Sequence, residues 1–158
     1  MDLLKLIAKS ADVCLKPWIH AVVPIDPSAP AVLDELNVRI ECRDPQGERC
    51  PERDLELEIY RSGDDINLML SWWDQPERPM LWQGRHPVWM HGENGQRLSA
   101  PQDAGPLEAL GRRLHSRSQV EVEEAGRGST EERGRGQGKK AREREKRIRE
   151  TDHRNASC

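Results

Sequence analysis

Apolar and polar side chains alternate in three stretches of this sequence. Residues 36–42, 55–59 and 66–72 each carry an apolar side chain at every second position, and a β-strand places such alternate side chains on one face of a sheet. The turns between these stretches are short, which favours antiparallel pairing because parallel neighbours need a long crossover. The pattern therefore predicts an antiparallel meander of three to four strands with one polar face.

The segment from Ile66 to Met90 holds more apolar surface than any other. It contains four of the five tryptophans, and each such ring buries roughly 150–250 Å² when it packs. Met69 and Trp73 fall on the second face of the strand that begins at Ile66, and after a proline-rich break the apolar pattern resumes at residues 80–82 and 88–90. We interpret most of the rings as core, and Met69 and Trp73 as a surface for a protein partner.

Two further stretches show helical periodicity. Over residues 2–16, apolar side chains recur every three or four positions and Pro17 follows, which predicts an N-terminal helix packed on the sheet. A helix lying on a membrane surface is the alternative, but the mixed charges of this stretch give weak attraction to anionic lipid. The leucine spacing of residues 106–115 predicts a second, short helix. The four prolines of residues 17–31 predict an extended connector without regular structure.

The positions of the aromatic residues indicate which part of the chain can form a hydrophobic core. Tyr60 and all five tryptophans precede residue 91, whereas residues 120–138 are rich in Glu, Gly, Arg and Ser/Thr, a composition that is typical of disorder. We therefore predict a small β-rich domain over residues 1–115, and a basic tail over residues 116–158 that is disordered or marginally helical. The expected fold class is α+β, mostly β, with an N-terminal helix on the meander.

Composition narrows the class of protein. Hydrophobic residues make up 35% and charged residues 34% of the 158 residues, against about 45–50% and about 25% in typical domains. No stretch reaches the roughly 20 apolar residues that span a bilayer, and the N-terminus does not resemble a signal peptide. The four cysteines do not make a disulfide framework at this length. We therefore expect a cytoplasmic protein with reduced thiols.

Two runs of sequence carry a resemblance to known proteins. They are LSWWDQPERPMLWQGRHPVWM and the earlier VRIECRDPQGERCPERDLELEIYRSGDDINLML. Together they resemble a set of small uncharacterised cyanobacterial proteins over roughly residues 15–115. The resemblance implies an intracellular protein of a photosynthetic bacterium, and it implies no activity and no binding residue.

Cysteine and histidine side chains offer one candidate metal site. Cys42 and Cys50 lie across a predicted turn, and His86 and His91 lie in a later loop. Two thiolates and two imidazoles could form a tetrahedral zinc site, but zinc knuckles usually space their cysteines two to four residues apart. We therefore favour one buried and one exposed cysteine and expect no cofactor. The sequence leaves open whether these four side chains approach one another.

The tail carries the strongest charge feature of the chain. Residues 133–149 contain nine basic and two acidic residues. The basic residues are Arg133, Arg135, Lys139, Lys140, Arg142, Arg144, Lys146, Arg147 and Arg149. Such a segment can neutralise the phosphates of RNA or DNA without sequence preference, although it lacks aromatic residues for base stacking. The other interpretation is a solvated tail that contacts nucleic acid incidentally.

These patterns favour a binding protein over an enzyme. No catalytic constellation has local support in the sequence, so we do not expect an enzyme. Our leading hypothesis is a non-enzymatic binding or assembly module that acts through the tryptophan-bearing sheet face with Met69 and Trp73. The alternative is a nucleic-acid-associated protein that uses the basic tail.

Overall fold

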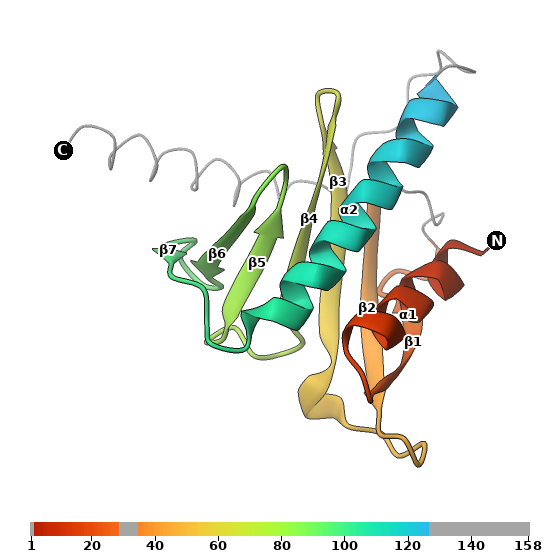
Figure 1. The fold of residues 1–158 in the computed structure, drawn as a ribbon, viewed down its shortest axis with the longest axis vertical. Helices are drawn as coiled ribbons and strands as arrows, with labels where there is room; N and C mark the ends of the chain where they lie inside the picture. The colour runs from red at the N-terminus through yellow and green to blue at the C-terminus, as the bar shows by residue number, and fades with distance from the viewer. Residues whose placement is uncertain (1, 29–34, 127–158) are drawn as a thin grey trace.

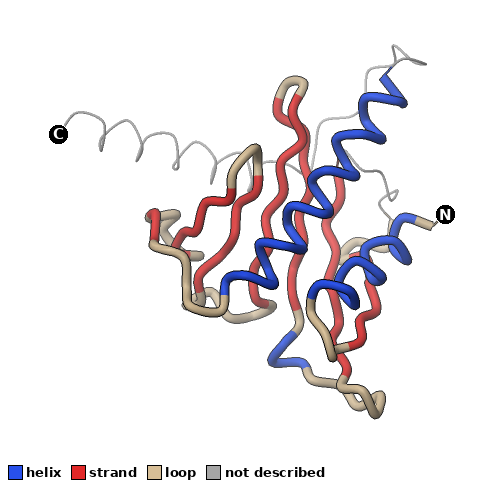
Figure 2. Tube along the Cα trace, viewed as in Figure 1, coloured by secondary structure: helices blue, strands red, loops and turns tan. Residues whose placement is uncertain are grey.

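The computed structural model describes residues 2–28 and 35–126, with side chains described up to residue 118. A seven-stranded antiparallel sheet forms one layer, and two helices form a second layer on one of its faces (Figures 1 and 2). The elements are α1 (Leu3–Cys14), β1 (Ile19–Pro24), β2 (Glu35–Arg43), η1 (Pro51–Arg53), β3 (Leu55–Ser62), β4 (Asp65–Trp72), β5 (Pro79–Gln83), β6 (Pro87–His91), β7 (Arg97–Leu98) and α2 (Ala104–Gly126). We call the face that carries the helices the inner face, and the opposite face the outer face.

The strands follow one another across the sheet in sequence order, β1 to β7, and every neighbouring pair is antiparallel. This confirms the predicted α+β class with mostly strands in an antiparallel arrangement. The predicted number of three to four strands was wrong. The additional strands are β1, which lies in the stretch expected to be irregular, and β5 to β7, which follow the proline-rich break.

Prolines concealed these additional strands in the sequence. Pro79 and Pro87 are the first residues of β5 and β6, and Pro24 is the last residue of β1, which is an edge strand. Proline is tolerated at the start of a strand and on an edge because its missing N–H removes no interior ladder bond. The prolines therefore delimit strands here instead of excluding them.

Two of the three positions on the free edge of β1 offer no N–H group to a further strand. The Ile25 N–H donates to the Asn37 carbonyl oxygen of β2, and bonding alternates along an antiparallel strand, so His20, Val22 and Pro24 direct their backbone groups to the free edge. The His20 N–H donates to Asp12 Oδ1 of α1 at 2.7 Å, and proline has no N–H to offer. Such capped edges resist pairing with another chain.

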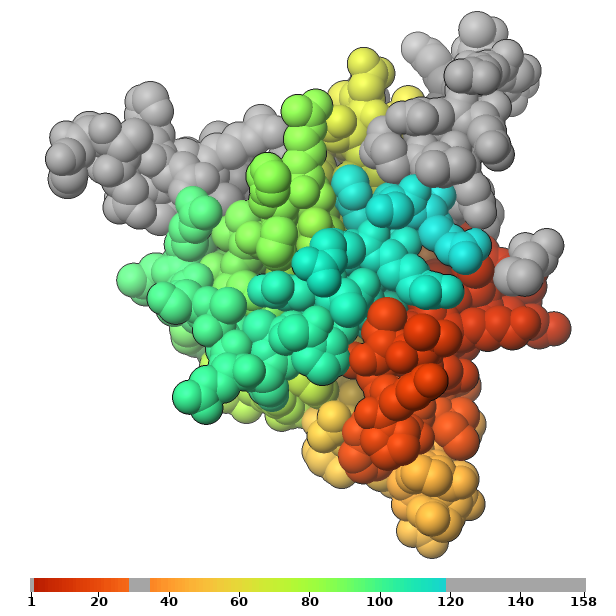
Figure 3. All heavy atoms as spheres, in the orientation of Figure 1, coloured from red at the N-terminus to blue at the C-terminus, as the bar shows by residue number. Residues whose placement is uncertain are grey.

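The main core lies between the inner face and both helices. In Figure 3, α2 and α1 lie over the sheet and cover its inner face. The helices contribute buried side chains at three- and four-residue spacing: Ile7 and Ala11 from α1, and Ala104, Leu107, Leu110 and Leu114 from α2. They pack on alternate apolar residues of β2 to β6, such as Val38, Leu57, Leu68, Leu81 and Trp89.

Both predicted helices are present. α1 begins after Asp2, whose Oδ1 accepts the Leu4 N–H at 3.0 Å as an N-cap. The helix predicted over residues 106–115 is part of the longer α2, which continues past the expected domain boundary to Gly126 and buries Ser118. The remainder of the predicted tail, residues 127–158, lies outside the described residues. Neither described helix has the length and apolar character needed to cross a membrane.

A second, smaller apolar cluster lies on the outer face. Tyr60, Met69, Met80 and Met90 are buried in it, with Trp82 and Val88 packed against them. The Trp82 Nε1–H donates to the Tyr60 hydroxyl oxygen at 2.8 Å. Met69 is only 2% exposed, so it supports this face from within and does not present the surface that the sequence pattern indicated. The neighbouring methionines of β5 and β6 are the physical reason, because they surround it.

Candidate functional site

Trp73 lies where β4 ends, and it belongs to neither apolar cluster of the described residues. Its neighbour Trp72 points to the inner face and packs against the main core. The strand alternation therefore sends Trp73 to the outer face, where it is half-buried. Its backbone N–H donates to the Asp54 carbonyl oxygen at 2.9 Å, which fixes the chain at this point.

Arg39 of β2 holds the Trp73 ring. The guanidinium carbon of Arg39 lies 4.4 Å from the centre of the Trp73 ring, a distance at which the ring face attracts a cation. The same guanidinium donates from Nε and Nη2 to Asp54 Oδ2, at 3.0 and 2.7 Å. The position of Arg39 is therefore set on one side by a carboxylate and on the other by the ring.

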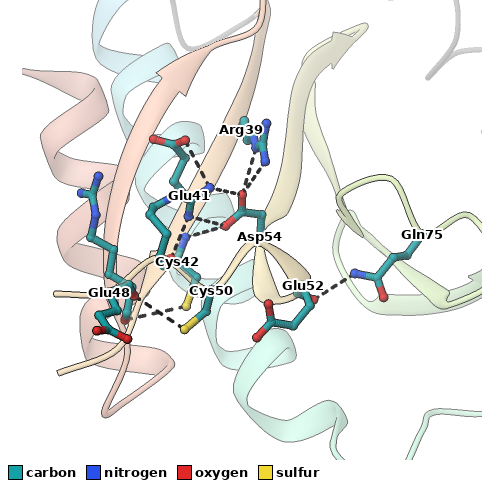
Figure 4. A network of polar contacts seen from close by, with 10 residues as sticks. Arg39, Glu41, Cys42, Glu48, Cys50, Glu52, Asp54 and Gln75 are labelled. Carbon is teal, nitrogen blue, oxygen red and sulfur yellow. Dashed lines mark hydrogen bonds and ion pairs between the residues drawn. The ribbon is translucent and has the colours of Figure 1, made fainter. Parts of the chain in front are cut away.

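Asp54 is the centre of this polar network, which Figure 4 shows from close by. Its side chain is fully buried, with 0% exposed. Arg49 donates from Nη1 to Oδ1 at 2.8 Å and from Nη2 to Oδ2 at 2.7 Å, and the Cys42 N–H donates to Oδ1 at 2.7 Å. A buried carboxylate with two guanidiniums and a backbone N–H around it has its hydrogen-bonding capacity used in full.

The electrostatics of the network keep Asp54 ionised. Burial alone would raise the pKa of Asp54, but hydrogen bonds from Arg49, the Cys42 N–H and Arg39 outweigh it, so the pKa lies below its usual value. The hydrogen bond with Asp54 in turn raises the pKa of Arg49. Both partners therefore remain charged at neutral pH, and the geometry around Trp73 is held by charge-assisted hydrogen bonds.

This lowered pKa predicts a dependence of stability on pH. A carboxylate with a folded pKa below its unfolded value of about 3.9 stabilises the fold above that pH, and the contribution is lost as pH falls through the folded pKa. We expect the difference in unfolding free energy between wild type and Asp54→Asn to be constant above about pH 5 and to shrink below about pH 4. Urea unfolding across this range measures it. A difference that grows on acidification would contradict the assignment.

An apolar strip continues the site across β1. The described residues include four exposed large hydrophobic side chains, and three of them lie at odd-numbered positions in or just after β1, which share the outer face: Ile19 at 45%, Val23 at 43% and Ile25 at 38% exposed. Val23 lies directly opposite Arg39 in the β1–β2 register. We call Ile19, Val23, Arg39 and Trp73 the outer-face patch.

Sequence reasoning found one member of this patch and missed the rest. The sequence pattern predicts Trp73 as a surface residue, whereas it assigns the strands a polar face without singling out Arg39 or Asp54. Arg39 and Asp54 are 15 residues apart, and only the register of β2 against β3 brings them together. One feature of the sequence could have indicated the pair: Asp54 directly precedes the strand of residues 55–59, and the polar face of the neighbouring strand carries arginines.

Two other arginine–tryptophan stacks lie near the same end of the sheet. The guanidinium carbon of Arg78 lies 3.6 Å from the centre of the Trp72 ring, and that of Arg53 lies 4.3 Å from the Trp18 ring. Burial lowers the pKa of Arg78. These stacks cover the rings of Trp18 and Trp72 and anchor the segment before β1, so their role is packing.

The arrangement around Cys42 does not provide an activated catalytic nucleophile. Cys42 lies opposite His20 in the β1–β2 register, and His20 Nδ1 lies 2.9 Å from Asp12 Oδ1, which has the outline of a Cys-His-Asp set. Burial, however, raises the pKa of the Cys42 thiol to about 11, and its hydrogen-bond partner is the Arg43 carbonyl oxygen at 3.9 Å. A thiol that stays protonated at neutral pH is not the activated nucleophile of a Cys-His-Asp catalytic set.

The zinc alternative finds no support in the part of the chain that the structure describes. Within that part, no three His, Cys, Asp or Glu side chains are grouped closely enough to hold a metal ion. Cys42 and Cys50 come together, as described below, but His86 and His91 do not join them. Cys42 is buried and Cys50 is partly exposed.

The basic residues proposed for nucleic-acid binding, Arg133 to Arg149, lie outside the described residues. Association with RNA or DNA through them stays a prediction.

Comparison with known proteins gives a family but no function. A family model described as a domain of unknown function, DUF8659, matches residues 4–117, which include all the described strands and the first half of α2. No curated protein and no solved structure matches the chain. The predicted resemblance to an uncharacterised family is confirmed, and its cyanobacterial source stays a prediction.

Proposed function

Because the chain belongs to the DUF8659 family, whose function is unknown, we propose a function from its own geometry: a non-enzymatic binding or assembly module that contacts a protein partner through the outer-face patch. The observation that carries the proposal is that exposed apolar side chains of β1 and a half-buried tryptophan after β4, linked by Arg39 of β2, share the face that neither α1 nor α2 covers. Exposed apolar side chains gathered on one face are typical of interaction surfaces.

The composition of the patch supports a protein partner. Tryptophan and arginine are the side chains most enriched among the residues that dominate binding energy at protein interfaces. Here they are adjacent, and Ile19 and Val23 extend the surface with apolar area. Glu41 of β2 and Glu56 of β3 lie between β1 and Trp73 in the strand register, so the surface combines apolar and charged side chains.

The patch is also ordered before any partner arrives. Asp54 holds Arg39 through two hydrogen bonds, and Arg39 holds the Trp73 ring. Long side chains that are already fixed lose less conformational entropy when they bind. The capped edge of β1 indicates the mode of binding: a partner docks face-on against the side chains, because the strand offers few free backbone groups for strand addition.

Truncating Trp73 tests the proposal. We expect Trp73→Ala to weaken association at least about 30-fold, the effect of removing a dominant interface residue. The free energy of unfolding should fall by only about 1 kcal/mol, because the ring contributes one cation–π contact and is outside both cores. Association is measured as sedimentation of the full chain and as retention of proteins from an extract of the source organism, and stability is measured by thermal unfolding.

A matched pair of valines controls for nonspecific loss of apolar surface. Val23 in the patch and Val13 on α1 are 43% and 50% exposed. Val23→Ala should weaken association and Val13→Ala should leave it unchanged. Equal effects of the two variants, or a loss of several kcal/mol of stability on Trp73→Ala, would place the binding elsewhere or Trp73 in the core.

A further inference from the structure

The chain turns back on itself after β2, and this places Cys42 opposite Cys50. Arg43 and Arg49 form an antiparallel bridge, so the next residues away from the turn, Cys42 and Cys50, also oppose each other. The Cys50 N–H donates to the Cys42 carbonyl oxygen at 2.9 Å. Opposed residues send their side chains to one face, and Figure 4 shows both thiols on the same side of the turn.

This geometry fits a disulfide. Directly opposed residues in an antiparallel pair have Cα atoms about 4.5–5.5 Å apart, and disulfides span Cα distances of about 4.4–6.8 Å. Both thiols are free in the structure. Cys50 is partly exposed, whereas Cys42 is 1% exposed behind it. One thiol can therefore meet a reagent from solvent, and the other is placed to complete the reaction.

We propose that Cys42 and Cys50 form a redox-modification site, which a low-molecular-weight disulfide such as oxidised glutathione converts into an intramolecular disulfide. The Cys50 thiolate attacks one sulfur of the oxidant, whose S–S bond breaks and releases one thiolate. The Cys42 thiolate then attacks the Cys50 sulfur of the mixed disulfide and releases the second. The two cysteines lose two electrons and two protons, and the oxidant leaves as two thiols. This proposal does not rest on the function proposed for the outer-face patch.

The surroundings make this exchange slow at neutral pH. Burial raises the pKa of both thiols, and the nearby carboxylates of Glu52 and Asp44 raise that of Cys50 further, while Arg53 lowers both. The thiolate is the reactive form, so the rate should rise about tenfold for each pH unit above neutrality. Because the exchange is slow, we expect this thiol pair to be oxidised only during prolonged exposure to an oxidant.

The test uses the full chain with oxidised glutathione at submillimolar concentration, followed by alkylation of the remaining thiols and tryptic peptide mapping. We expect residues 40–43 to be recovered linked to residues 50–53, because trypsin cuts after Arg39, Arg43, Arg49 and Arg53. An opposed thiol acts at an effective concentration of millimolar or more. The linked peptide should therefore outweigh glutathione bound to Cys50 by about tenfold, and dithiothreitol should reverse it.

Variants separate this pair from the other cysteines. Cys14→Ser should give the same linked peptide, and Cys42→Ser should accumulate glutathione on Cys50, because the second step is then blocked. Stable glutathione on Cys50 in the wild type would overturn the proposal, and so would linkage of either cysteine to Cys14 in preference to the other. The wild-type chain alone decides between these outcomes, so a variant that fails to fold does not obscure the result.

Discussion

Replacing Asp54 with alanine should lower the free energy of unfolding by about 3 kcal/mol. Removing one partner of a buried ion pair typically costs about 3–5 kcal/mol, because the remaining charge is left without compensation. Here 29% of each of the Arg39 and Arg49 side chains is exposed. Water can therefore replace some of the hydrogen bonds that the two arginines lose, and we expect a cost at the lower end of this range. The Cys42 N–H also loses its acceptor. Urea unfolding at neutral pH measures the change.

A carboxylate in the adjacent turn controls for net charge. Glu48 is exposed, and Glu48→Ala should change stability by less than about 0.5 kcal/mol, as is usual for surface substitutions. Asp54→Ala should also free the Trp73 ring, which near-UV circular dichroism reports. Equal effects of the two variants would show that Asp54 does not organise the network.

Replacing Trp89 with alanine should have the largest effect among the tryptophans, a loss of about 3–5 kcal/mol. The ring is 4% exposed and belongs to the main core. Its Nε1–H donates to Glu108 Oε1 of α2 at 2.8 Å, which ties β6 to the helix layer. The substitution removes both the buried ring and this link, and thermal unfolding of the purified variant measures the loss.

Trp89→Phe separates the two contributions. It keeps most of the buried area and removes the hydrogen bond, so we expect it to cost about 1–2 kcal/mol. Comparison with Trp73→Ala then distinguishes a core ring from a surface ring on the same sheet. If Trp89→Ala costs no more than Trp73→Ala, our division of the rings between core and surface is wrong.

Local sequence patterns predicted the helix at the N-terminus and the antiparallel pairing of β2, β3 and β4. The strands could be predicted because strict alternation joined by short turns is compatible with few other arrangements. They could not count the strands. Pro24, Pro79 and Pro87 are compatible with strand ends and edges, but in sequence they are indistinguishable from breaks. Met69 was placed on the correct face, yet its burial depends on methionines from strands that the pattern did not reveal.

The site was less predictable than the fold. Trp73 was identified by its place in an alternating strand, which is local information. Trp73, its partner Arg39 and their common anchor Asp54 come from three different strands or strand ends, and their meeting depends on the register of β2 to β4. No spacing in the sequence encodes that register. The exposure of Ile19 and Val23 was missed for a related reason, since β1 itself was not expected.

Site-specific photo-cross-linking from the outer face tests the central claim most directly. p-Benzoylphenylalanine is placed at position 71, where Ser71 points to the outer face two residues before Trp73, and separately at position 13 on α1. After irradiation of cells of the source organism, we predict a discrete cross-linked species from position 71 and none from position 13. Trp73→Ala in the same chain should abolish it. Cross-linking from position 13 alone, or a species from position 71 that is unaffected by Trp73→Ala, would contradict a partner surface centred on Trp73.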